Sequence, residues 1–281
     1  MILARSPSMM RNLARRWRSK NLTIGLVPTM GALHAGHASL IRRARRECDR
    51  VAVSIFVNPA QFGPNEDFAR YPRSLPQDRR LCASCGADAV YHPGTQDVYP
   101  AGYRTFVEVE GLSSLLCGRF RPGHFRGVAT VVLKLFQTVV PHRAYFGEKD
   151  FQQLAIIKRM SSDLHLPVKI VGCPTIREKD GLALSSRNAY LSPEERAQAR
   201  RLYAGLSRGV ERAAAAGAKP ESVTQAVRSE ILAIPGVSID YVSLVDENTL
   251  EDAPRLSGRL RLLAAIRLGK TRLIDNVPVI C

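Results

Sequence analysis

The sequence lacks any apolar run approaching the ~18 consecutive residues that a membrane-spanning helix requires. Aromatic residues are also few, at 6% of the 281 residues, and none alternate with the arginine clusters as a base-stacking surface for nucleic acid requires. A disordered chain is excluded by the 45% hydrophobic content, because that content can bury enough surface to offset the entropy lost on ordering. We therefore expect a soluble globular protein of one large or two modest domains, with neither a membrane nor a nucleic-acid partner.

Acidic residues are scarce beside basic ones, with 25 Asp and Glu against 41 Lys and Arg, a formal charge of +16. Such a charge attracts polyanions, so a basic RNA-binding protein is an alternative function. The arginines are scattered along the chain, however. A small substrate rich in phosphate explains the basic residues that serve the function as well as RNA does.

Cysteine is too sparse for a disulfide framework, with six residues in a chain of this length. Cys82 and Cys85 have CxxC spacing, but no second pair or histidine cluster completes a zinc site.

The first twenty residues contain no acid, as in a transit peptide. We predict instead a strand at residues 2–4 and a basic amphipathic helix at 9–20, with no cleaved leader and a cytoplasmic location.

Strands and helices alternate through the first part of the chain. Residues 22–27 and 51–57 predict buried strands and residues 35–46 the helix between them, which makes a βαβ unit. The alternation continues with strands predicted at 89–91, 105–109, 144–146 and 168–171, and helices at 74–85, 127–139 and 151–164. This order predicts an α/β, Rossmann-like parallel sheet with helices on both faces.

The pattern changes after Cys173. Ser192-Pro193-Glu194-Glu195 is typical of a helix start, with a serine cap, a proline in the first turn and acids after it. Helices are predicted at 193–216 and 221–232, and strands at 239–245, 260–266 and 271–277. We therefore predict a Rossmann-like domain at residues 1–173 and a smaller C-terminal α+β domain at 174–281.

The sharpest motif is Pro28-Thr29-Met30-Gly31-Ala32-Leu33-His34-Ala35-Gly36-His37, where the first strand of the βαβ unit turns into its helix. Ligands of open α/β sheets bind at the carboxyl ends of strands, and helix N-termini attract phosphate. The glycines let the backbone approach an anion closely, and the imidazoles can donate to phosphate oxygens as charge accumulates during attack on phosphorus.

Amide side chains follow the next strand. Asn58 and Gln61 are suited to hold the hydroxyl and carboxylate groups of a small polar substrate, although an isolated Asn-Pro also favours a plain turn. Residues 67–78, with Asp78 at their end, predict a mobile lid. Residues 121–128, a basic loop with glycines, favour an anion loop and a helix cap equally.

Two later segments bear polar groups. Lys149 supplies a cation for polyphosphate, Asp150 suits ribose or Mg²⁺, and Gln153 lies one helical turn further on. The segment Leu184-Ser185-Ser186-Arg187-Asn188 offers two hydroxyls and a guanidinium that could clamp the terminal phosphates of a nucleotide. The alternative for that segment is a buried turn.

The histidine motif resembles the HIGH signature of the nucleotidylyl-transferase superfamily. Together, PTMGALHxGH, FVNPxQF, RPGHFRGV, YFGEKDxQQ and LSSRN occur in order over nearly the whole chain, and they resemble the pantoate–β-alanine ligase (pantothenate synthetase) family. The sequence departs from the family pattern at Gly118-Arg119-Phe120, and at Pro141-His142, where Pro-Asp is expected.

The resemblance implies ATP-dependent condensation of (R)-pantoate with β-alanine through a pantoyl adenylate, giving pantothenate, AMP and diphosphate, with Mg²⁺ and a homodimer. The first domain then binds nucleotide and pantoate, and the second acts as a lid. The implied catalytic residues are His37, His34, Lys149, Ser185 and Arg187. The implied ATP-binding residues are Met30, Gly31, Ala32, Leu33, His34, Ala35, Gly36, His37, Gly147, Glu148, Lys149, Asp150, Ile176, Leu184, Ser185, Ser186 and Arg187. Pantoate and β-alanine are expected at Gln61, Gln153 and Asn58, and Asp78 is the candidate metal ligand.

A second enzyme remains an alternative. A nucleotidylyltransferase acting on a phosphorylated acceptor shares the histidine and serine motifs, but it needs an acceptor-phosphate site in place of the amide pair. Release of AMP that depends on an amine distinguishes the ligase from it.

Overall fold

The computed structural model describes residues 1–64 and 66–280, so Cys281 lies outside the described residues. The chain divides into two compact units. Unit 1 comprises Met1–Ser113, Arg121–Glu148 and Ile156–Pro174. Unit 2 comprises Ser114–Phe120, Lys149–Ala155 and Thr175–Cys281.

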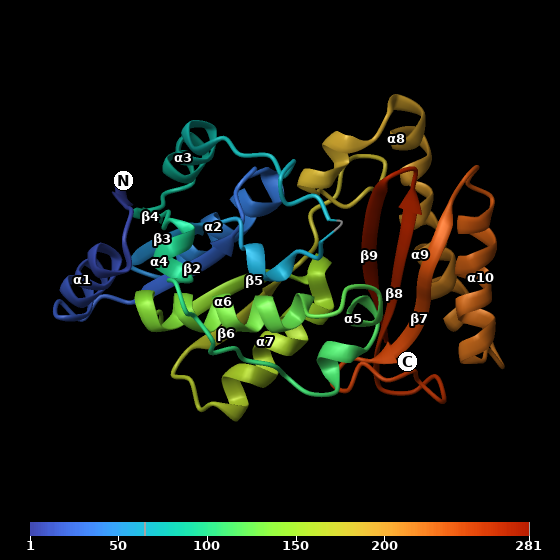
Figure 1. The fold of residues 1–281 in the computed structure, drawn as a ribbon. Helices are drawn as coiled ribbons and strands as arrows, with labels where there is room; N and C mark the ends of the chain where they lie inside the picture. The colour runs from blue at the N-terminus through green and yellow to red at the C-terminus, as the bar shows by residue number, and fades with distance from the viewer. Residues whose placement is uncertain (65, 281) are drawn as a thin grey trace. The chain divides into compact units, whose positions relative to one another are not determined.

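Unit 1 is built on a parallel sheet whose six strands, among the described residues, have the order β1-β4-β3-β2-β5-β6 (Figure 1). The strands are β1 (Ile2–Ala4), β2 (Ile24–Thr29), β3 (Arg50–Ile55), β4 (Ala89–Tyr91), β5 (Arg143–Gly147) and β6 (Lys169–Cys173). From β2 the chain adds β3 and β4 on one side and later β5 and β6 on the other. The boundary between β2 and β5 is therefore the switch point at which ligands bind in such sheets.

Helices cover both faces of this sheet, with α2 and α3 on one face and α1 and α6 on the other (Figure 1). The helices up to α7 are α1 (Pro7–Arg18), α2 (Ala35–Glu47), α3 (Leu75–Ser84), α4 (Thr95–Val98), α5 (Cys117–Phe120), α6 (His124–Val139) and α7 (Phe151–Asp163). The short helices are η1 (Pro59–Gln61), η2 (Leu112–Ser114), η3 (Glu148–Asp150) and η4 (Ser186–Tyr190). The predicted Rossmann-like architecture is confirmed.

The α2 helix shows why these segments fold as they do. Its buried residues, Ala38, Leu40, Ile41 and Ala44, recur at three- and four-residue intervals and so form one apolar stripe. That stripe packs on the buried strand residues of β2 and β3. Burial of this stripe fixes the orientation of the helix whose N-terminus carries the histidine motif.

Unit 2 contains an antiparallel sheet in the order β7-β8-β9. Its strands are β7 (Ser238–Asp246), β8 (Arg259–Leu268) and β9 (Thr271–Ile280), and its longer helices are α8 (Pro193–Ala199), α9 (Arg201–Ala213) and α10 (Pro220–Leu232). The α9 and α10 helices pack on the sheet around Leu206, Val227 and Leu262, each 0% exposed. The predicted α+β character of this part is confirmed.

Two predicted elements are wrong. Residues 105–109 form no strand, because the Val107 N–H donates to the hydroxyl of Thr130 on α6 at 2.9 Å rather than to a neighbouring strand. The helix predicted at 193–216 is two helices, α8 and α9, which meet at Arg200. No helix in the described part of the chain is long and apolar enough to cross a membrane.

Candidate active site

The loop between β2 and α2 bears the histidine motif. Gly31 has a φ of +87° and Ala32 one of +50°, so two consecutive residues adopt the left-handed conformation, which is strained for alanine. The Gly31 N–H donates to the Thr29 hydroxyl at 3.2 Å. The loop thus reverses the chain within a few residues, and α2 begins directly after it.

The imidazoles of His34 and His37 lie side by side at the start of α2, with ring centroids 4.2 Å apart. The Gly36 N–H donates to Nδ1 of His34 at 3.1 Å, and the His34 N–H donates to Nδ1 of His37 at 3.3 Å. Because each Nδ1 accepts, the neutral rings carry their proton on Nε2. Two ring donors therefore stand at a helix N-terminus, where backbone N–H groups and the helix dipole also favour an anion.

Asp78 supports this loop from α3. Its side chain is 3% exposed, and its two oxygens accept from the N–H groups of Ala32 at 3.1 Å and Leu33 at 2.8 Å. Burial raises the pKa of the Asp78 carboxyl, against the opposing effect of these two donors. The predicted placement of Asp78 in a mobile lid is wrong because it is a buried helical residue that holds the loop. Its role as a metal ligand stays a prediction.

Asn58 and Gln61 follow β3 and are 1% and 8% exposed. The Asn58 amide donates to the Gln61 side-chain oxygen at 3.0 Å and to the Gly127 carbonyl at 3.1 Å, while its oxygen accepts from the Tyr99 hydroxyl at 2.8 Å. The Gln61 amide contacts the Met30 sulfur at 3.2 Å. Asn58 therefore orients Gln61, which borders the histidine loop through Met30.

The loop at residues 121–128 holds the backbone of Gln61. Arg121 Nη2 donates to the Gln61 carbonyl at 3.2 Å, and Nδ1 of His124 lies 2.8 Å from the same oxygen. Arg121 also forms a two-point ion pair with Glu66, at 2.6 and 2.5 Å. Burial works against the charge of Glu66, but the bonds from Arg121 outweigh it, so the pKa of that carboxyl lies below its ordinary value. This loop begins α6, and the Arg121 charge already has a partner.

Unit 2 contains the second set of predicted residues. Lys149 lies in η3, with its side chain 19% exposed and its Nζ 3.8 Å from the carboxylate of Asp150. Gln153 is half-buried on the first turn of α7. The neighbouring Gln152 is 4% exposed and bonds the backbone at Leu115 and Cys117, so it has a structural role.

The segment 176–188 folds back on itself within unit 2. Arg177 pairs with Ala183 in an antiparallel bridge, and the Leu184 N–H donates to the Ile176 carbonyl at 3.0 Å. Ser185 then caps η4 by accepting from the Arg187 N–H at 3.3 Å. The fold thus brings Ile176 next to the serine and arginine residues predicted to bind ATP.

The predicted residues fall in two groups. Unit 1 contains Met30, Gly31, Ala32, Leu33, His34, Ala35, Gly36, His37, Asn58, Gln61, Asp78, Gly147 and Glu148, whereas unit 2 contains Lys149, Asp150, Gln153, Ile176, Leu184, Ser185, Ser186 and Arg187. Tyr99 and Glu66 were not predicted. Tyr99 contacts Asn58 from 41 positions away, and Glu66 acts through Arg121, 55 positions away, so no local pattern marks either residue.

The described residues contain neither a cluster of metal-ligating side chains nor an exposed thiol. Within residues 1–64 and 66–280, no three His, Cys, Asp or Glu side chains gather as a metal cluster. The described cysteines are free and buried, and burial raises the pKa of the Cys82 thiol to about 12. That thiol is protonated at neutral pH and is a poor nucleophile.

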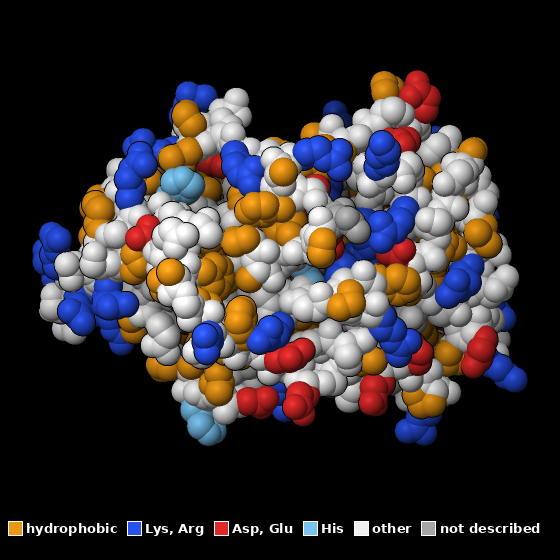
Figure 2. Space-filling view, viewed as in Figure 1, with side chains coloured by type: hydrophobic (Ala, Val, Ile, Leu, Met, Phe, Trp, Pro, Cys, Tyr) orange, Lys and Arg blue, Asp and Glu red, His pale blue; other side chains and the backbone are white. Residues whose placement is uncertain are grey.

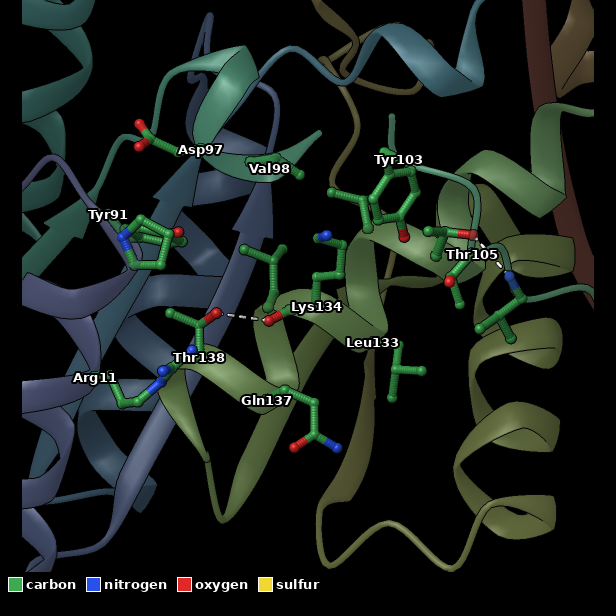
Figure 3. A pocket seen from close by; sticks show the side chains of 15 residues that line it. Arg11, Tyr91, Asp97, Val98, Tyr103, Thr105, Leu133, Lys134, Gln137 and Thr138 are labelled. Carbon is green, nitrogen blue, oxygen red and sulfur yellow. Dashed lines mark hydrogen bonds between the residues drawn. The ribbon is translucent and has the colours of Figure 1, made fainter. Parts of the chain in front are cut away.

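A separate cavity of about 320 Å³ lies in unit 1 beside α4 and α6 (Figure 3). Lys134 lies in it with its ammonium 4.1 Å from the ring centroid of Tyr103, and burial lowers the pKa of this lysine. The described residues that line it include none of those predicted to bind ATP, pantoate or β-alanine. The candidate active site is therefore distinct from this cavity.

Comparisons with known proteins agree on one family. Residues 2–278 match the family model described as pantoate-beta-alanine ligase. A pantothenate synthetase of Moorella thermoacetica is 54% identical over 277 residues, which cover 99% of this chain and 98% of that protein. The crystal structure of a pantothenate synthetase from Thermus thermophilus has a TM-score of 0.95 and 46% identity, with both chains fully covered.

A further solved structure includes ligands. It is a pantoate-beta-alanine ligase from Francisella tularensis, complexed with beta-gamma ATP and beta-alanine. It is 39% identical to this chain, with a TM-score of 0.81, and the match covers 99% of this chain and 97% of that one.

Proposed function

The chain belongs to the pantoate–β-alanine ligase family and is an ATP-dependent, AMP-forming ligase, and we propose that both groups of site residues serve a reaction that proceeds in two successive half-reactions. In the first, a carboxylate oxygen of pantoate attacks the α-phosphorus of ATP, and the bond to diphosphate breaks. In the second, the amine of β-alanine attacks the pantoyl carbonyl, and AMP leaves. The adenylate is needed because AMP is a far better leaving group than a carboxylate oxygen.

The histidine pair carries this proposal. Attack on phosphorus concentrates negative charge on the phosphate oxygens, and donors already in position stabilise that charge without reorganising. His34 and His37 are held with Nδ1 as acceptor, which leaves Nε2–H as the donating group of each ring. We assign stabilisation of this charge to the Nε2–H donors of both rings, with His37 as the principal hydrogen-bond donor to the phosphate oxygens.

A rapid-quench measurement of diphosphate release tests this assignment. His37→Ala is expected to lower the rate of adenylation by about 10²–10³, the scale of losing one oxyanion-type donor. The matched control is His165→Asn, at an exposed residue with a φ of +49° that asparagine tolerates, and its rate is expected to be that of the wild type. An unchanged diphosphate burst in His37→Ala would remove the assignment.

The substrate side of the proposal rests on the amides. Gln61 is assigned to pantoate and also to β-alanine, because its side chain borders Met30 at the histidine loop. Asn58, with its amide contacts directed at Gln61, Gly127 and Tyr99, is assigned to orient Gln61. Gln153 is assigned to pantoate by the family pattern and its half-buried position.

For the nucleotide, we assign Lys149, Ser185 and Arg187 to the phosphates. By the family pattern, ATP is also assigned to Met30–His37, Gly147–Asp150, Ile176, Leu184 and Ser186. Mg²⁺ is proposed to accompany ATP, sharing charge among the phosphate oxygens when bound. The residues fit this mode, because Mg²⁺ bound with phosphates needs only one or two carboxylates and Asp150 is 48% exposed. Asp78 fits it less well, since both of its oxygens accept from the backbone.

The remaining expectations complete the proposal. Residues 174–281 are proposed to act as a lid during the reaction, which would shield the adenylate from water. A homodimer is proposed on the family resemblance alone, and a cytoplasmic location is proposed with it. No observation favours transfer to a phosphorylated acceptor over this reaction.

A further inference from the structure

Two adjacent residues of β9, Asp275 and Asn276, contact both segments of unit 2 that bear proposed ATP-binding residues. They are 3% and 4% exposed. Successive residues of a strand direct their side chains to opposite faces of the sheet, so a neighbouring pair can contact two different segments. Neither residue belongs to the motifs discussed so far.

Asp275 anchors the segment at 176–188. Its carboxylate forms a two-point ion pair with Arg177, at 2.5 and 3.0 Å. Arg177 also donates to the Asn276 carbonyl at 3.3 Å, and its guanidinium stacks 3.9 Å from the ring centroid of Tyr203. These contacts fix the residue next to Ile176.

Asn276 contacts the other segment. Its side-chain amide donates to the Lys149 carbonyl at 2.9 Å, and its side-chain oxygen accepts from Arg261 Nη1 at 3.2 Å. Arg261 is itself 6% exposed and is held by an ion pair to Glu247 at 2.7 Å. The amide is therefore fixed in the one orientation that directs its N–H at Lys149.

The same arginine contacts the beginning of α7. The Arg261 guanidinium lies 4.0 Å from the ring centroid of Phe151, two residues after Lys149. The backbone of Lys149 is thus held by Asn276, and Phe151 packs on Arg261, the residue that orients Asn276. A displacement of about 1 Å in a charged group can cost 10²-fold in rate, so this placement matters for phosphate chemistry.

We propose that Asn276 is a positioning residue. The hydrogen bond from its side-chain amide to the Lys149 carbonyl determines where the Lys149 ammonium meets the phosphates of ATP. The proposal rests on the role proposed above for Lys149. Asn276 does not touch the substrate in this account and acts only through the lysine.

Asn276→Asp tests the proposal with little change in shape. The carboxylate keeps an acceptor for Arg261 but has no N–H to donate to the Lys149 carbonyl. We expect the rate of diphosphate release to fall about 10- to 100-fold, with the KM for pantoate unchanged. The control is Val279→Ala on the same strand, which opens a gap in the core of unit 2 and is expected to lower stability while keeping the rate. Rate losses that track the loss of stability in both variants would overturn the proposal.

A double-mutant cycle with Lys149→Ala separates this inference from the function it rests on. If Asn276 acts through the lysine, adding Asn276→Asp to Lys149→Ala changes the single-turnover rate less than about threefold. Losses that multiply would overturn the inference and leave the role of Lys149 intact. A full rate in Lys149→Ala would instead contradict the role of Lys149, and the inference with it.

Discussion

The side chains nearest the proposed chemistry are held by backbone groups. His34 and His37 accept from N–H groups of their own segment, and Asp78 accepts from the N–H groups of Ala32 and Leu33 in the same loop. A loop with two consecutive left-handed residues persists only when such contacts determine it. The preorganisation that catalysis requires is thus visible in single hydrogen bonds.

At this scale, Gln61→Ala is expected to weaken pantoate binding at least about 10-fold and ATP binding much less, because hydrogen bonds to a charged group contribute roughly 1.5–3 kcal/mol. Calorimetric titration of each ligand measures this difference. Gln137→Ala, at an exposed residue of α6 beside the separate cavity, is the control and is expected to bind both ligands normally. Equal losses for pantoate and ATP in Gln61→Ala would contradict the assignment.

His142 gives the protein a pH-dependent contact. Its Nδ1 accepts from the Ile24 N–H at 2.9 Å, an acceptor role that the aspartate expected from the family pattern would also fill. Burial, together with the charge of Arg18, lowers the pKa of His142. The folded state therefore prefers the neutral ring, so this contribution to stability is complete above the ordinary histidine pKa. It is lost as the pH falls below that value and through the lowered pKa of His142 in the folded protein.

Chemical denaturation at pH 7.5 and 5.5 tests this contact. Between pH 7.5 and pH 5.5, the free energy of unfolding of the wild type is expected to fall by about 1 kcal/mol more than that of His142→Asp, the net value of one hydrogen bond. The reason is that the carboxylate of the variant still accepts at pH 5.5. An identical pH dependence in the two proteins would show that His142 is not the titrating group.

Among the elements, the contact of α6 with η1 determines where Gln61 lies. A Cβ on Gly127 would collide with the carbonyl of Ala60 and the nitrogen of Gln61, so only glycine permits this approach. Alanine in a helix otherwise stabilises by roughly 0.5–1 kcal/mol relative to glycine. Gly127→Ala therefore destabilises the protein if α6 and η1 are in close contact at this residue, and stabilises it if they are not.

Gly127→Ala is expected to destabilise the protein by about 1–3 kcal/mol, as overpacking does, and to raise the KM for pantoate more than that for ATP. Thermal unfolding and steady-state kinetics measure the two effects. A stabilised variant with normal kinetics would mean that η1 and α6 are not in contact at this residue.

The elements also show what the sequence could predict. The boundaries of β4 agree with the prediction, and those of β2, α2 and β5 agree within two residues, because continuous apolar runs and helical periodicity mark them directly. Residues 105–109 have a strand-like pattern, but the acceptor for Val107 is a side chain of a distant helix. No local pattern contains that information.

The candidate site divides in the same way. His34, His37 and Lys149 belong to motifs that are contiguous in sequence. Asp78, Tyr99 and Asn276 act through hydrogen bonds to residues between 41 and 127 positions away, so their roles become visible only in the folded chain. The groups proposed to contact the substrates thus lie in contiguous motifs that the sequence displays, whereas the holding roles of the others depend on contacts that only the fold creates.

For the whole molecule, the charge of +16 is the feature that its ligase activity explains least. Many of the arginines are already paired with acids, as Arg121 is with Glu66 and Arg177 with Asp275. On the face drawn in Figure 2, basic side chains are interrupted by apolar, acidic and uncharged surface. This face therefore does not show the continuous basic stripe or patch that the RNA-binding alternative requires.

The most direct test of the whole account is the formation of AMP and pantothenate from ATP and Mg²⁺, with (R)-pantoate and β-alanine supplied singly and together. We predict equal amounts of AMP and pantothenate when both are present. With pantoate alone, we predict diphosphate in no more than stoichiometric amount to the enzyme. AMP that forms without β-alanine, or an absence of turnover that depends on pantoate, would contradict the account.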